Sequence, residues 1–104
     1  MHWDKLFAAF IAGAVFANVV PHFVHGISGD PFPTPFAKPP GRGLSSPRVN
    51  VLWALLNLLI GYAFLWISGL QLEPGAGLLC FFAGIAFLSI LLSVRFQQKH
   101  KRPD

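Results

Sequence analysis

Two imidazoles, an amide and a carboxylate lie close together in this sequence, at the end of its first apolar segment. Asn18, His22 and His25 are spaced by four and three residues, so they share one helical face if the helix continues through Pro21. Asp30 follows after a short glycine-containing stretch that permits a turn. Nitrogen and oxygen ligands of this kind suit zinc, iron or a similar ion. These residues are therefore a candidate metal or ligand site.

A structural role explains the same two histidines without any ligand. The pair lacks the intervening glutamate of the His-Glu-x-x-His metalloprotease motif. Histidine rings also favour the membrane interface, and Gly26 directly after His25 could end the helix there. We expect interfacial histidines, with metal or haem ligation as the alternative, and we predict no resident cofactor.

Proline dominates the stretch that follows. Residues 21–48 hold seven of the nine prolines, and within residues 30–40 proline alternates with Phe32 and Phe36. Such a pattern favours an extended polyproline-like conformation. An extended segment loses little entropy on binding, which suits a docking surface. A loop that simply covers the ends of its own helices is the alternative.

The end of this loop carries charge and hydroxyl groups where the second apolar segment begins. Ser46 and Pro47 have the residue types of an N-cap and a first helical position, and they predict a helix start. Because helix N-termini and arginine both bind phosphate, Arg42, Ser45, Ser46 and Arg48 could hold an anionic lipid headgroup. Ordinary positive charge beside a membrane is the alternative.

Three apolar segments must position these groups. They cover about residues 5–24, 47–70 and 76–96, with loop 25–46 between the first two and a basic tail at 97–104. Each approaches the roughly 20 residues that cross about 30 Å of hydrocarbon. With 54% hydrophobic and 12% charged residues among 104, a soluble fold could not bury this much apolar surface. We predict an all-α membrane protein with one integral domain. The first segment is the shortest, and a cleaved signal peptide is its alternative.

The distribution of basic residues predicts the orientation in the membrane. With three spans, the first loop and the C-terminus share one side, which holds seven of the eight Lys and Arg residues, against Lys5 alone on the other. Such an excess marks the cytoplasmic side. We expect the N-terminus outside a bacterial cytoplasmic membrane. Because the basic residues flank apolar segments, nucleic acid is not an expected partner.

Small and polar residues indicate where the helices touch, since close packing and interhelical hydrogen bonds associate helices in lipid. The tight turn at 73–77 predicts that the second and third helices are antiparallel neighbours. The lone Cys80 is expected to be a small buried residue. The predicted contact residues are Ala9, Gly13 and Ala17 in the first segment, Asn50, Ala54, Asn57, Gly61 and Ser68 in the second, and Ala76, Cys80 and Gly84 in the third.

Asn57 lies deep within the second apolar segment. An unpaired amide in hydrocarbon is costly, so we expect an interhelical hydrogen bond. Contact with a quinone, with a lipid or other ligand, or with a second copy of the chain is the alternative.

The leading functional hypothesis is a non-enzymatic accessory, assembly or oligomeric subunit. Its partners would be the lipid bilayer and either copies of itself or a larger membrane complex. The alternative is a metal- or ligand-binding membrane protein, redox or lipid-related, that uses the Asn18, His22, His25 and Asp30 cluster. A transporter is disfavoured because all four acidic residues lie outside the apolar segments.

Overall fold

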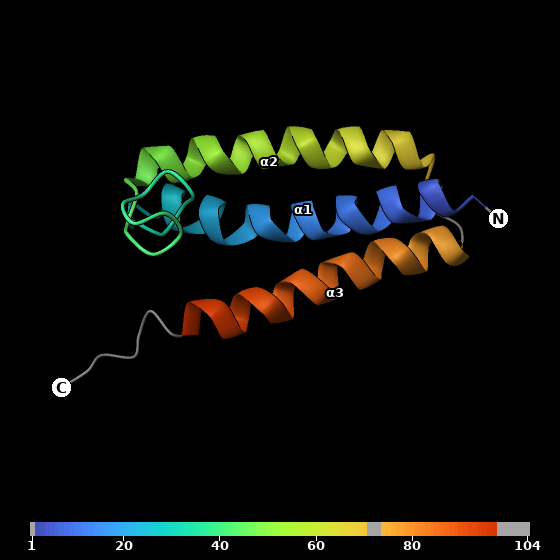
Figure 1. The fold of residues 1–104 in the computed structure, drawn as a ribbon. Helices are drawn as coiled ribbons and strands as arrows, with labels where there is room; N and C mark the ends of the chain where they lie inside the picture. The colour runs from blue at the N-terminus through green and yellow to red at the C-terminus, as the bar shows by residue number, and fades with distance from the viewer. Residues whose placement is uncertain (1, 71–73, 98–104) are drawn as a thin grey trace.

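Three helices make up the fold in the computed structural model, which describes residues 2–70 and 74–97 (Figure 1). They are α1 (Trp3–Ile27), α2 (Pro47–Ser68) and α3 (Ala76–Gln97). Each is long and apolar enough to cross a membrane. The prediction of an all-α chain with three candidate spans is confirmed. The predicted tail lies, apart from Gln97, outside the described residues.

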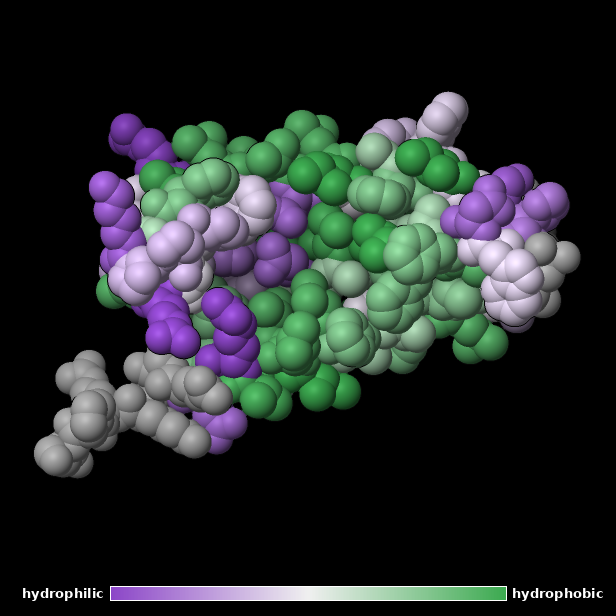
Figure 2. All heavy atoms as spheres, viewed as in Figure 1, coloured by the Kyte–Doolittle hydropathy of each residue, from purple (hydrophilic) through white to green (hydrophobic). Residues whose placement is uncertain are grey.

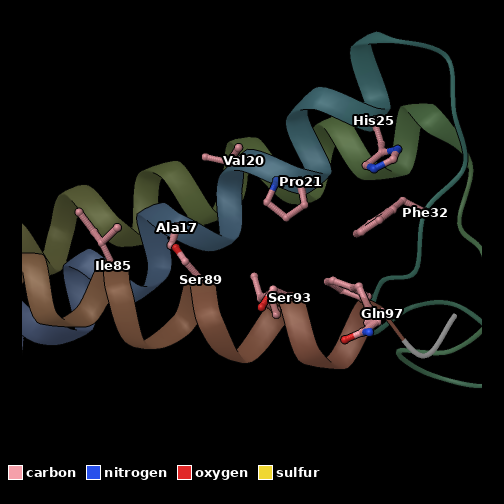
Figure 3. Close-up of a pocket in the computed structure, with 11 residues that line it drawn as sticks. Ala17, Val20, Pro21, His25, Phe32, Ile85, Ser89, Ser93 and Gln97 are labelled. Atoms are coloured by element: carbon pink, nitrogen blue, oxygen red, sulfur yellow. The ribbon is translucent and has the colours of Figure 1, made fainter. Parts of the chain in front are cut away.

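Helix α1 is longer than its apolar segment indicated. It has 25 residues against 22 in each of α2 and α3, so the prediction that it would be the shortest is wrong. It continues through Pro21, and Figure 3 shows its ribbon changing direction close to that residue. Apolar helices tolerate an internal proline because neighbouring groups satisfy the freed carbonyl.

The end of α1 also differs from the prediction. Gly26 does not end the helix, since Ile27 is the last helical residue and Ser28 is the C-cap. Gly29, one residue further on, adopts the left-handed conformation with φ 78°. Gly26 instead allows a close approach to α2, because a Cβ there would lie 2.5 Å from a methyl group of Val51.

Helix α1 is the central helix, with α2 on one side and α3 on the other (Figure 1). It runs antiparallel to α2 and parallel to α3. The prediction that α2 and α3 are neighbours is wrong, since the two barely touch. A short connection sets their directions but not their lateral order. Helix α1 offers small residues to both of them.

The α1–α3 contact depends on two glycines that face the opposite backbone. A Cβ on Gly13 would collide with the carbonyl of Phe81, and one on Gly84 with the carbonyl of Phe10. Both glycines therefore lie where the two backbones approach each other closely. Cys80 is only half-buried, contrary to expectation, and the predicted contact residue Ala76 is exposed.

The α1–α2 contact uses the predicted stripe of α2. Its five buried residues are those named from the sequence: Asn50, Ala54, Asn57, Gly61 and Ser68. A Cβ on Gly61 would meet the ring of Phe16 at 2.8 Å. On α1, Ala9 is fully buried, while Ala17 is half-buried.

The loop between α1 and α2 is folded back on itself. Phe32 and Ser45 form an antiparallel bridge, with N···O distances of 3.2 and 3.0 Å. Between them the chain turns tightly, and the Thr34 carbonyl accepts from the amides of Ala37 and Gly41. The predicted extended polyproline form is therefore wrong from residue 35 onwards, where the chain turns and bends. The loop covers the helix ends, which was the alternative to an extended segment.

Candidate functional site

Asn50 joins the loop to the helices. Its side chain is fully buried (0% exposed). Its Nδ2 lies 3.0, 3.2 and 3.1 Å from the carbonyl oxygens of Phe32, Ser45 and Ser46, so its two hydrogens are shared among three acceptors. Its Oδ1 lies 2.8 Å from Nδ1 of His22. One amide therefore connects both sides of the Phe32–Ser45 bridge to α1.

These contacts assign the His22 tautomer. Because Nδ2 of Asn50 points to carbonyl oxygens, its Oδ1 must accept, and Nδ1 of His22 must carry the proton. The other ring nitrogen, Nε2, is then an acceptor in the neutral imidazole. The His22 ring meets Phe32 and Trp53 edge-on, with centroids 5.4 and 6.4 Å away. At 3% exposure, the His22 ring is buried among protein groups.

The four candidate metal ligands do not converge. His25 stacks on the ring of Phe32 at 4.2 Å, while the Asp30 side chain is exposed. Asn18 instead hydrogen-bonds Asn57. Across residues 2–70 and 74–97, no group of three or more His, Cys, Asp or Glu residues could hold a metal ion.

Asn57 makes the interhelical hydrogen bond expected of it. Its Oδ1 accepts from Nδ2 of Asn18 at 3.3 Å, and its own Nδ2 donates to the Trp53 carbonyl at 2.8 Å. A polar track therefore runs along the α1–α2 contact from Asn50 at the loop end to Asn57 near the middle of α2.

The predicted lipid-binding residues divide into two kinds. Arg42 and Arg48 are exposed. Ser46 is the N-cap of α2, as predicted, and its Oγ accepts from the amide of Val49 at 3.2 Å. Ser45 is buried, with its hydroxyl 2.5 Å from that of Thr34. Both hydroxyls are thus engaged in hydrogen bonds within the fold, although Ser46 is exposed like the two arginines.

A cavity of about 580 Å³ lies between the C-terminal halves of α1 and α3 (Figure 3). Its wall is largely apolar, with Val20, Pro21 and Ile85 among the lining residues. The polar groups in the wall are His25 and three side chains of α3, and Figure 3 shows them near the gap between the two helices. These polar residues are His25, Ser89, Ser93 and Gln97.

A second cavity, of about 150 Å³, lies beneath the loop. Leu92 and Phe96 line both cavities. The residues that line it come from all three helices and the loop: Asn18, His22, Pro33, Thr34, Pro35, Gly41, Trp53, Leu92, Arg95 and Phe96. Sequence reasoning missed both cavities because their residues are far apart along the chain. The Ser89/Ser93 spacing of four was the one local signal.

Comparison of the chain with known protein families, with curated proteins and with solved structures found no match in any of the three.

The geometry distinguishes groups that hold the loop in place from cavities that are open to a ligand. The amides, His22 and the loop hydroxyls bond one another and fix the loop on the helix ends. The two cavities are where a ligand could fit.

Proposed function

We propose that this chain is a small, non-catalytic subunit of a membrane assembly, and that the loop between α1 and α2 is its docking surface. The observation that carries the proposal is the set of hydrogen bonds made by Asn50, which fixes the loop on the helix ends. Phe36 and Leu44 are 64% and 63% exposed on this loop. Apolar side chains on a pre-ordered loop bind a partner with little further loss of entropy.

The helices support assembly within the bilayer. Among the helices, α3 packs mainly on α1, and its remaining surface carries exposed apolar side chains such as Leu79, Phe82 and Ile90. Further helices can cover such a surface through van der Waals packing. The proposed partners are copies of this chain or the helices of a larger complex.

The proposal includes the orientation of the chain and the type of membrane that it spans. Figure 2 shows hydrophobic atoms along the helices and hydrophilic residues concentrated towards the two ends. At the loop end lie Lys38, Arg42, Arg48 and Arg95, and at the other end lies Lys5. By the positive-inside rule the loop faces the cytoplasm and the N-terminus lies outside, in a bacterial cytoplasmic membrane.

Photo-crosslinking in native membranes tests the docking surface. A benzophenone amino acid would replace Phe36 or Leu44 in turn, with Leu59, an exposed residue in the middle of α2, as the matched control. We expect protein adducts of one defined mass from positions 36 and 44, and loss of both in an Asn50→Ala background. The adduct should co-migrate with a native complex that contains the chain. A monomeric chain without adducts from either position would overturn the proposal.

A second candidate function is binding of a lipid-soluble ligand in the α1–α3 cavity. Its volume of about 580 Å³ falls within the roughly 300–1,000 Å³ of small-molecule sites. The polar groups His25, Ser93 and Gln97 could orient a polar head group while the apolar wall holds a hydrocarbon body. This is the lipid-related form of the ligand-binding hypothesis.

Organic extraction and mass spectrometry of the purified protein test this candidate. We expect one amphiphile at a fixed ratio, and less of it in a Ser93→Leu variant that narrows the cavity. An Ala63→Leu variant, at an exposed position of α2 away from this cavity, would be the control. Equal amounts in all three proteins would argue for bulk lipid. Elemental analysis of the same samples tests the metal alternative.

A further inference from the structure

The internal proline of α1 leaves one backbone carbonyl without its usual donor. In an uninterrupted helix the Ala17 carbonyl would accept from the amide of residue 21, but Pro21 has no N–H. Ala17 and Pro21 both line the cavity of about 580 Å³ between α1 and α3. Because a helical carbonyl points towards the residue four positions on, this oxygen lies at the cavity wall. Hydrocarbon itself offers it no donor.

A hydroxyl group of α3 lies opposite this carbonyl. Figure 3 shows the Ser89 side chain pointing from α3 towards Ala17, and both residues line the cavity. Serine in a helix commonly bonds a carbonyl of the preceding turn, as Ser93 does with the carbonyl of Ile90 at 2.6 Å. The Ser89 hydroxyl makes no hydrogen bond with the residues that the structure describes. A donor and an acceptor therefore line the same part of the cavity without bonding each other.

Polar groups continue along this cavity towards the loop end. Ser89, Ser93 and Gln97 are spaced by four residues on α3, so they follow one face over about 12 Å. Among the described residues that line the cavity, none is Lys, Arg, Asp or Glu. Arg95 is directed at the loop instead, since a Cβ on Gly41 would lie 2.6 Å from its Nη2. The lining therefore favours an uncharged ligand with several hydrogen-bonding groups.

We propose that the α1–α3 cavity binds the head group of an uncharged, hydroxyl-bearing lipid, of which a monoacylglycerol is an example. One ligand hydroxyl donates to the Ala17 carbonyl and accepts from Ser89, and the other head-group oxygens lie along the face that ends at Gln97. The apolar wall at Val20 and Ile85 contacts the fatty chain. The proposal rests on the second candidate function, ligand binding in this cavity, and names the class of ligand. It does not require the loop to dock a partner.

Native mass spectrometry of the purified full chain in mild detergent tests the ligand class. Three probes share an oleoyl chain: monooleoylglycerol carries hydroxyls, methyl oleate carries none, and oleoyl lysophosphatidate adds a phosphate charge. We expect saturable binding of one monooleoylglycerol per chain, at least about fivefold tighter than either comparison lipid, because a hydrogen bond is lost or a charge is left unpaired. Equal binding of all three would overturn the proposal but leave lipid binding in this cavity. No saturable binding of any probe would overturn both.

Variants on each wall of the cavity locate the bound head group. Ser89→Val and Ser89→Thr both introduce a β-branched side chain at an exposed position and differ in one hydroxyl. We expect Ser89→Val to weaken monooleoylglycerol binding about fivefold and Ser89→Thr to retain it. Pro21→Ala restores an N–H for the Ala17 carbonyl and should weaken binding to a similar extent, with the helical circular dichroism unchanged. Equal affinity in the valine and threonine variants, or unchanged affinity in Pro21→Ala, would overturn the proposal.

Discussion

Asn50 and Asn57 lie two helical turns apart on α2, and each amide makes a different kind of connection. Asn57 bonds a neighbouring helix, which its depth in an apolar segment predicted, because hydrocarbon offers an amide no other partner. Asn50 bonds three loop carbonyls and His22. Those partners come from segments up to 28 residues away, so helical periodicity placed Asn50 on the right face but could not identify its partners.

Replacing Asn50 should release the loop. In Asn50→Ala, buried carbonyls and the His22 Nδ1–H lose their partner, and each unsatisfied group costs about 1–3 kcal/mol. We expect a loss of about 3 kcal/mol in the free energy of unfolding, measured by SDS titration in mixed micelles. Trypsin should also cleave after the exposed Arg42 faster than in the unaltered chain. An unchanged cleavage rate would contradict the role given to Asn50.

Ser46 tests the start of α2 separately from the loop. Ser46→Ala removes the side-chain acceptor for the Val49 amide and should lower the free energy of unfolding by about 1 kcal/mol. Ser46→Asp keeps an acceptor at the N-cap and is the matched control, with stability close to that of the unaltered chain. The same SDS titration distinguishes them. Equal losses in both variants would mean that the cap contributes through something other than hydrogen bonding.

At the scale of the helices, the sequence predicted which face of a helix is buried better than it predicted which helices are neighbours. The small and polar stripe of α2 is its buried face, and Gly13 and Gly84 lie at a helix contact as expected. The wrong pairing of α2 with α3 arose because a short turn constrains direction alone. Glycines on α1 and α3 let the two backbones approach closely, and this packing favours α3 on α1 over α3 on α2.

Alanine at Gly84 should separate α3 from α1. The new Cβ would collide with backbone atoms of Phe10 and Ala14, which cannot rotate away, and overpacking of this kind costs about 2 kcal/mol. Gly77→Ala is the control on the same helix, since its Cβ would meet one methyl group of Leu70 at 3.1 Å. Thermal unfolding in detergent should show a clear loss for Gly84→Ala and little change for Gly77→Ala. Similar midpoints for the two would refute this packing.

At the scale of the whole molecule, the lengths of the apolar segments were enough to predict three apolar helices, because hydrocarbon thickness sets the length of a span. The loop conformation and both cavities were beyond such reasoning. Phe32 shows why: it is a buried residue in contact with His22, His25 and Phe96, and its proline-flanked context does not identify those partners. Contacts between distant segments decided its burial, and local propensity did not.

The distribution of Lys and Arg also predicts how the whole molecule is oriented in the membrane. In a Cys80→Ala chain, Arg42→Cys places a thiol on the loop and Gly75→Cys places one beyond the opposite ends of the helices. Because Lys and Arg are retained on the cytoplasmic side, a membrane-impermeant maleimide should label position 75 in intact cells. Position 42 should react only after permeabilisation. The reverse pattern would place the loop outside, and with it the docking surface and the cavity beneath the loop.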